Sequence, residues 1–88
     1  MKEDEIKKEI EYALEESNTE YSHWTIGITD DPERRRKEHR SDGKDTGSWT
    51  VWEADTEDIA RSVEEYFIDK GMNGAGGGQG TPNFVYIF

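Results

Sequence analysis

Apolar residues occur in a few short stretches of this 88-residue chain, and their spacing differs between stretches. In residues 21–29 they recur at every second position, which places them on one side of an extended chain because successive strand side chains face opposite ways. Residues 48–54 and 83–88 are equally short and rich in aromatic and β-branched residues. These stretches predict three strands around a thin core, as expected for so small a domain.

Two further stretches carry apolar residues at the spacing of a helix. In residues 3–17 they recur every four residues from Ile6, and in residues 56–70 every four residues from Ile59. This spacing gives each segment one apolar stripe and a polar opposite face. We therefore predict two amphipathic helices, the second of which ends before Gly71.

A third helix is predicted over residues 32–40 by its start signals, because Asp31 is a typical N-cap and Pro32 a typical first helical residue. This segment contains no aliphatic residue. Either it is weakly attached or its arginine stems cover the sheet. The element order predicts an α+β fold, with a three-stranded antiparallel sheet flanked by three helices.

The whole chain, residues 1–88, is expected to form a single domain. Its glycine-rich segment contains six glycines but no P-loop lysine, and it follows a helix rather than a strand. It is therefore interpreted as a connector and not as a phosphate cradle. The expected parts are an N-terminal amphipathic helix (1–18), a central unit (21–70), the glycine-rich loop (71–82) and a C-terminal strand (83–88).

Charge is distributed unevenly along the chain. The net charge is -10, yet six of the eleven basic residues lie within residues 34–44. An acidic body disfavours DNA, but a local basic surface can still bind phosphates. Two partners are thus open: DNA, through the basic helix between Arg34 and Arg40, or a basic protein on the acidic surface. The acid content also fits a protein adapted to high salt.

Composition excludes several other classes of protein. The chain has no cysteine, which excludes disulfides and cysteine-ligated zinc. No apolar run reaches the roughly 18–20 residues of a membrane span, and the first ten residues are too charged for a signal peptide. We expect a soluble, cytoplasmic protein with no membrane partner.

The segment TIGITDDPERRRKEH resembles the second motif of the GIY-YIG nuclease family. That motif has a Tyr-Ile-Gly strand, a turn with threonine, then a helix with arginine and histidine four residues apart. A later helix of the family carries a glutamate, and Glu64 in VEEYFIDK occupies the corresponding position. The residues that match the strand, the turn and the first helix are Thr25, Ile26, Gly27, Thr29, Pro32, Arg35 and His39.

The chain departs from the family pattern in four places. Arg36 stands where the family often has leucine, and the family's late asparagine has no clear match, since Asn73 and Asn83 lie on either side of the expected region. Thr25 stands where the family has the second-motif tyrosine, and residues 8–17 form a helix where the family has its first, Gly-Ile-Tyr strand. The C-terminal segment FVYIF resembles that missing strand. If residues 83–88 pair beside residues 23–29, as in a circular permutation, Tyr86 takes the place of the first-motif tyrosine.

The resemblance implies DNA endonuclease activity with one divalent metal ion, Mg²⁺ or Mn²⁺. Arg35 would then contact phosphate, Glu64 would hold the metal, and a tyrosine or His39 would assist proton transfer. Tyr86 or Tyr21 would replace the absent tyrosines. The implied catalytic residues are Arg35, His39, Glu64, Tyr86, Thr25 and His23, the last placed beside Thr25 on the same strand face.

Each of these residues also has a structural interpretation. Arg35 and its neighbours can screen the acidic body, His39 and Glu64 can be ordinary surface residues, and Tyr86 can be a packed strand aromatic. The three tryptophans are expected in the core or over the sheet. Three hypotheses therefore stand: a small nuclease, the same fold without activity as a binding module, or an unrelated acidic domain that contacts a basic protein.

Overall fold

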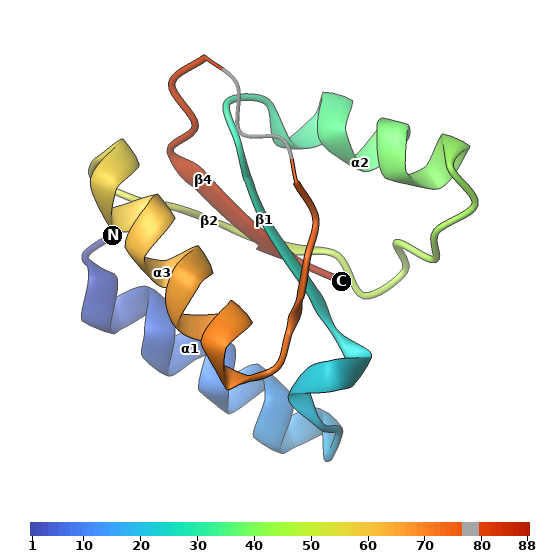
Figure 1. Ribbon diagram of the computed structural model, residues 1–88, viewed down its shortest axis with the longest axis horizontal. Coiled ribbons are helices and arrows are strands. Elements are labelled where there is room, and N and C mark those ends of the chain that lie inside the picture. Colours follow the sequence, from blue (N-terminus) through green and yellow to red (C-terminus); the bar gives the residue numbers. More distant parts are fainter. Residues whose placement is uncertain (77–79) are drawn as a thin grey trace.

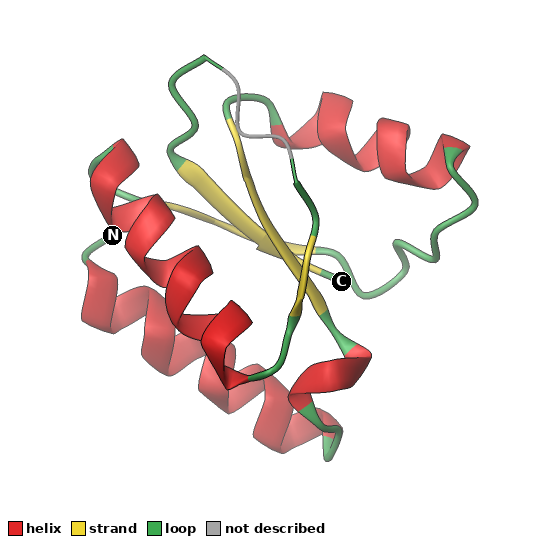
Figure 2. Cartoon of the chain, in the orientation of Figure 1, coloured by secondary structure: helices red, strands yellow, loops and turns green. Residues whose placement is uncertain are grey.

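The computed structural model describes residues 1–76 and 80–88, which form three α-helices and a four-stranded mixed sheet (Figures 1 and 2). The elements, in chain order, are α1 (Glu3–Ser17), η1 (Tyr21–His23, a 3₁₀ turn), β1 (Thr25–Thr29), α2 (Pro32–Ser41), β2 (Thr50–Glu53), α3 (Glu57–Lys70), β3 (Asn73–Gly74) and β4 (Phe84–Ile87). The α+β class and the three helices confirm the sequence prediction. None of the helices in the described residues is long and apolar enough to cross a membrane.

The last strand of the chain lies in the middle of the sheet. The strand order is β2-β4-β1-β3, and β4 runs antiparallel to both β1 and β2. In this register Tyr86 lies between Gly27 on β1 and Val51 on β2. The predicted pairing of residues 83–88 with the strand around residue 27 is therefore confirmed.

The prediction of only three strands is wrong, because the glycine-rich segment contributes β3. This two-residue strand runs parallel to β1, with Thr25 opposite Asn73 and Ile26 opposite Gly74. Backbone hydrogen bonds hold β3 against β1, and the Asn73 side-chain amide donates a further hydrogen bond of 3.0 Å to the Ser22 carbonyl. A strand this short, held by its backbone and one amide, has no apolar alternation that would predict it.

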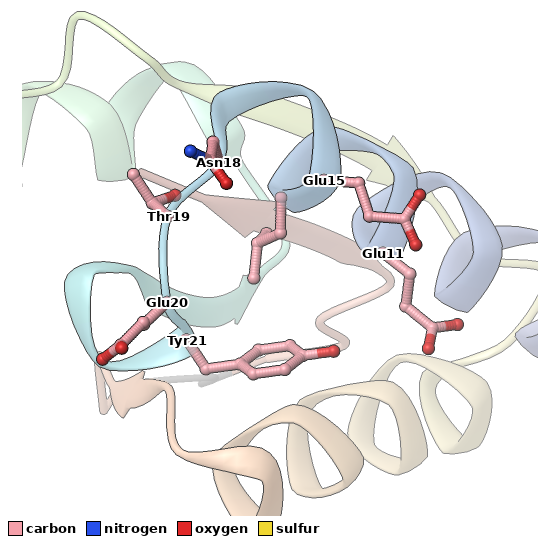
Figure 3. Close-up of a pocket in the computed structure, with 7 residues that line it drawn as sticks. Glu11, Glu15, Asn18, Thr19, Glu20 and Tyr21 are labelled. Carbon is pink, nitrogen blue, oxygen red and sulfur yellow. The ribbon is translucent and has the colours of Figure 1, made fainter.

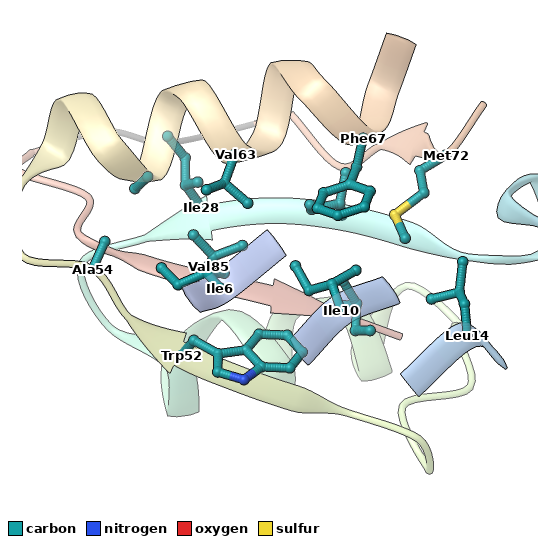
Figure 4. Packing of buried hydrophobic residues seen from close by; sticks show 13 residues of the cluster. Ile6, Ile10, Leu14, Ile28, Trp52, Ala54, Val63, Phe67, Met72 and Val85 are labelled. Carbon is teal, nitrogen blue, oxygen red and sulfur yellow. The ribbon is translucent and has the colours of Figure 1, made fainter. Parts of the chain in front are cut away.

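The main core lies between one face of the sheet and the helices α1 and α3 (Figure 4). The predicted apolar stripes of both helices are buried there, and alternate residues of β1 and β4 point into the same layer. Trp52 closes this core from β2, and its indole nitrogen donates a 2.9 Å bond to Glu9. The central buried residues are Ile6, Ile10, Leu14, Ile26, Ile28, Val63, Phe67, Val85 and Ile87.

Helix α2 covers the opposite face of the sheet, away from α1 and α3 (Figure 1). It begins as predicted, with the Asp31 side chain accepting from the backbone N–H of Arg34 and Pro32 in the first turn. Its single buried side chain is His39. Because α2 has no aliphatic stripe, polar and aromatic contacts must attach it to the sheet, and these contacts form the candidate site.

Candidate functional site

Three side chains meet on the face of the sheet that α2 covers. The Tyr86 hydroxyl lies 3.2 Å from Arg35 Nε and 2.9 Å from His39 Nε2. Arg35 and His39 are one helical turn apart on α2, so both point at the same spot on β4. We call Arg35, His39 and Tyr86 the polar triad. The structure thus brings together three of the six residues that the resemblance implied.

Gly27 makes room for the tyrosine. A Cβ atom placed on Gly27 would lie 2.3 Å from the Tyr86 hydroxyl oxygen and 2.9 Å from Ala75 Cβ. Both distances are shorter than real Cβ contacts allow. The glycine that the sequence motif places in β1 therefore has a steric purpose, because any larger residue would displace the triad's central ring.

The Arg35 guanidinium is held by three elements. Besides Tyr86 it donates to Glu38 Oε1 at 3.1 Å and to the Ala75 carbonyl, just after β3, at 3.2 Å. These bonds use three of the five N–H groups of a guanidinium. The side chain is 21% exposed, and its other two N–H groups have no hydrogen-bond partner among the described residues.

The protonation states in the triad follow from burial and from the fixed charge of Arg35. Burial raises the pKa of Tyr86, which the Arg35 hydrogen bond lowers in part. Burial, followed by the Arg35 charge, lowers the pKa of His39. At neutral pH both groups are thus uncharged. Since Arg35 Nε can only donate, the Tyr86 oxygen accepts from it, whereas the direction of the bond between Tyr86 and His39 Nε2 is set by the tautomer of the imidazole.

Aromatic rings enclose the triad on its other sides. Trp49 stacks on Tyr86 with ring centres 4.3 Å apart and planes 17° apart, and the Phe88 ring lies 4.7 Å from that of His39. The prediction that Trp49 covers the sheet is confirmed. The contacts that Trp49 and Phe88 make with the site could be found from strand alternation, once Tyr86 is assigned to the sheet face that α2 covers. Phe88, for example, lies two residues after Tyr86 and therefore points to the same face.

Glu64 lies on α3, half-buried, and makes no hydrogen bond to the triad. Burial raises the pKa of its carboxyl group, and the neighbouring Arg61 lowers it in part. Its negative charge in turn contributes to the raised pKa of Tyr86, so the carboxylate and the phenol interact electrostatically. Within the described residues no group of three or more histidine, cysteine, aspartate or glutamate side chains could hold a metal ion.

The remaining predicted residues lie apart from the triad. Thr25 begins β1, where its backbone exchanges two hydrogen bonds with Phe88. The expectation that His23 shares its strand face is wrong, because the chain turns into η1 and the exposed His23 belongs to that turn. Tyr21 packs against Phe67 of α3 and so cannot replace a tyrosine of the site.

The basic residues of α2 fall into two groups. Arg34 forms an ion pair with Asp30 at 2.8 Å, and Arg36 donates to the Thr46 carbonyl at 3.1 Å. Exposed cations remain at Lys37, Arg40 and, in the following loop, Lys44. These last three form what we call the basic surface, which is available to an anionic partner.

A separate acidic depression of about 400 Å³ lies between the end of α1 and the segment that follows it (Figure 3). Glu11, Glu15 and Glu20 surround it, and the Tyr21 ring forms one wall. Of the residues considered for the site, it contains only Tyr21 among the described residues, and it lies apart from the triad. No family model, curated protein or solved structure matches this chain.

Proposed function

We propose that this chain is an endonuclease of the GIY-YIG type that hydrolyses DNA phosphodiester bonds with a divalent metal ion. The observation that carries the proposal is the convergence of Arg35, His39 and Tyr86 on one point. Two of these residues come from the matched motif, and the third comes from the strand that the resemblance identifies as the missing one.

The sheet topology supports a circular permutation of the family fold. Strand β4 lies beside β1 and antiparallel to it, with Tyr86 directly opposite Gly27. The strand that the family places before the motif is thus supplied here by the other end of the sequence. The segment after α3 returns the chain to the sheet through β3.

Arg35 would supply the positive charge that phosphoryl chemistry requires. Its two uncommitted N–H groups can bind a phosphate oxygen, and a guanidinium remains charged at any physiological pH. The bonds to Glu38, Tyr86 and Ala75 fix its orientation. Such a preorganised donor stabilises the negative charge that develops on phosphate oxygens.

Tyr86 and His39 would handle the proton. The phenol oxygen and His39 Nε2 share a 2.9 Å hydrogen bond, so in the Nδ1–H tautomer of the imidazole the phenol can pass its proton to Nε2. Because His39 is neutral near pH 7, it can accept a proton. Arg35, bonded to the phenol oxygen, stabilises the negative charge left there.

Glu64 would hold the metal ion. Mg²⁺ commonly keeps several waters and takes only one or two carboxylates, so a single half-buried glutamate is a sufficient protein ligand. Once bound, the ion supplies positive charge to the leaving oxygen. Its assignment to this site comes from the resemblance, in which the later helix carries the glutamate.

The basic surface would hold the DNA backbone. Lys37, Arg40 and Lys44 lie on α2 and its following loop, on the sheet face that carries the triad. Most acidic residues of α1 lie on the far side of the sheet. Binding would therefore be oriented, with α2 toward the phosphates, and would weaken steeply with salt because each neutralised phosphate releases counterions.

One observation favours a second function, a binding module that has the same fold but no catalysis. Tyr86 is 0% exposed, whereas a catalytic hydroxyl must meet its substrate. Arg35 also has internal acceptors for most of its bonding capacity. In this alternative the polar triad attaches α2 to the sheet, and the basic surface alone contacts DNA.

A cleavage assay separates the two functions. Nicked, branched and single-stranded DNA would be incubated with Mg²⁺ or Mn²⁺ at low and high salt. The variants would be Arg35→Lys, which keeps the charge, and Glu64→Gln, with Glu65→Gln as the matched exposed control on α3. Thermal unfolding of each variant would establish that it is folded.

For the nuclease we expect cleavage by the wild type and by Glu65→Gln. Cleavage should fall roughly 100-fold or more in Arg35→Lys and Glu64→Gln, a typical effect of removing one stabiliser of developing charge. No cleavage, together with salt-dependent DNA binding that needs no metal, would instead establish the binding module. Neither cleavage nor binding would exclude both and leave a basic protein as the partner to seek.

A further inference from the structure

A second depression, of about 260 Å³, lies beside the polar triad. Residues from three separate parts of the chain line it: the turn into β1, the loop after α2, and the residue that follows β4. Its lining residues are Thr19, His23, Trp24, Asp45, Ser48 and Phe88. We call it the aromatic pocket.

Aromatic rings account for half of the residues that line the pocket. Trp24 and Phe88 are half-buried and His23 is exposed. The Trp24 indole N–H donates a 2.7 Å bond to the Thr19 hydroxyl, which fixes the orientation of its ring. The pocket is therefore lined by three aromatic rings, of which that of Trp24 is held in one orientation.

Polar groups complete the pocket. Asp45 Oδ1 accepts a 2.9 Å bond from the Gly47 backbone N–H, which holds the carboxylate in place. The other Asp45 oxygen, the Ser48 hydroxyl and the His23 ring form no hydrogen bond within residues 1–76 and 80–88. Flat aromatic faces beside a fixed acceptor suit a planar heterocycle that carries N–H donors at its edge.

One lining residue connects the aromatic pocket with the polar triad. Phe88 lines the pocket, and its ring also lies 4.7 Å from that of His39 and 5.6 Å from that of Trp49. A ligand on the pocket side of Phe88 is therefore separated from His39 by a single ring. This is the arrangement expected for a base whose own strand continues to the phosphate at Arg35.

We infer that the aromatic pocket binds one unpaired nucleobase that carries an exocyclic amine, such as cytosine. This inference rests on the proposed function, because the base would belong to the DNA strand at the triad. The rings would stack on the base, as in other single-strand binding sites, and Asp45 would accept from the amine. The pocket is smaller than the roughly 300–1,000 Å³ of drug-sized ligand sites, which suits one base.

The test measures binding without metal, so it does not depend on cleavage. ¹⁵N-labelled protein would be titrated with deoxycytidine monophosphate, thymidine monophosphate and inorganic phosphate, with the Trp24 indole N–H signal as the probe. The variant Asp45→Asn keeps an oxygen that can accept from the Gly47 N–H, but it removes the negative charge and the second oxygen that would accept from the base. Asp42→Asn, in the same loop but outside the pocket, makes the same change in charge.

We expect deoxycytidine monophosphate to shift the Trp24 signal at lower concentration than thymidine monophosphate. Phosphate alone should leave the signal unmoved. Asp45→Asn should weaken cytosine binding roughly tenfold, within the range of good base contacts, while Asp42→Asn should bind as the wild type does. Equal shifts from phosphate alone, or unchanged binding by Asp45→Asn, would overturn the inference.

A second arm distinguishes a base in a strand from a free nucleotide. An eleven-residue thymidine strand would be compared with the same strand carrying one central cytosine. Tighter binding of the cytosine strand, lost in Asp45→Asn, supports the inference even where no DNA is cleaved. Equal affinity of the two strands overturns it, even where cleavage establishes the nuclease.

Discussion

Gly27 and Tyr86 lie opposite each other on paired strands, and the tyrosine ring occupies the space where a side chain of residue 27 would be. The contact joins a residue of the matched motif to a residue near the other end of the sequence. It also sets the position of the hydroxyl between Arg35 and His39. The geometry of the polar triad thus depends on the absence of a side chain.

The first prediction is that Gly27→Ala destabilises the protein. The added methyl group would lie 2.3 Å from the Tyr86 hydroxyl, and overpacking of this kind costs about 1–3 kcal/mol. Urea denaturation would measure the free energy of unfolding. Gly47→Ala is the control, because its Cβ would meet a single side-chain atom, the Asp45 Oδ1 oxygen, at the longer distance of 3.1 Å. Equal losses in the two variants would contradict the steric argument.

The second prediction concerns the hydroxyl itself. Tyr86→Phe keeps the ring and its stacking on Trp49, but it leaves Arg35 Nε and His39 Nε2 without their shared partner. A buried polar group that loses its partner costs about 1–3 kcal/mol. Calorimetry should show a lower melting temperature. The control is Tyr12→Phe, at a side chain that is 64% exposed, which should leave the melting temperature unchanged. An unchanged melting temperature in Tyr86→Phe would refute a structural role for the hydroxyl.

The third prediction is a loss of stability in mild acid through His39. Burial lowers the pKa of His39 from its usual 6.5, so below that pH the unfolded chain takes up a proton before the folded protein does. The free energy of unfolding should therefore fall as pH drops from about 6.5 through the folded pKa. Denaturation at several pH values should show that the free energy of unfolding falls less in His39→Gln than in the wild type. An identical fall in the two proteins would contradict the assignment of this pH dependence to His39.

The fourth prediction concerns Glu64, whose contribution to stability changes with pH in the opposite direction to that of His39. Burial raises the pKa of Glu64 above 4.5, so its contribution to stability is present below about pH 4.5 and is lost as pH rises through the folded value. Glu64→Gln should thus be more stable than the wild type at pH 7, with the difference vanishing in acid. Glu65→Gln should gain less, because it removes only the repulsion between the two neighbouring carboxylates. A Glu64→Gln protein less stable at pH 7 would exclude this cause.

The helices could be predicted from the sequence because each has its own local signal. The apolar stripes of α1 and α3 and the Asp31-Pro32 start of α2 are set by neighbouring residues. The face of α2 that meets the sheet could not be predicted from apolar spacing, since α2 has no aliphatic residue. Only the four-residue spacing of Arg35 and His39 indicated it.

Contacts between distant segments were harder to predict. The pairing of β4 with β1 followed from a resemblance and not from any local pattern. His23 was misplaced because alternation continues in the letters of residues 21–29, while the backbone turns at residues 21–23. The bond from Arg35 to the Ala75 carbonyl left no sequence signal, because any residue supplies a carbonyl.

The central position of β4 has a consequence for how the protein is made. Strands β1 and β2 both pair with β4 and not with each other, and 51 residues separate Arg35 from Tyr86. On the ribosome β2, and the edge of β1 opposite β3, must remain unpaired until residues 84–87 emerge from the exit tunnel. Such non-local pairing slows folding and exposes strand edges. The nascent chain is therefore most vulnerable to aggregation just before its central strand becomes available.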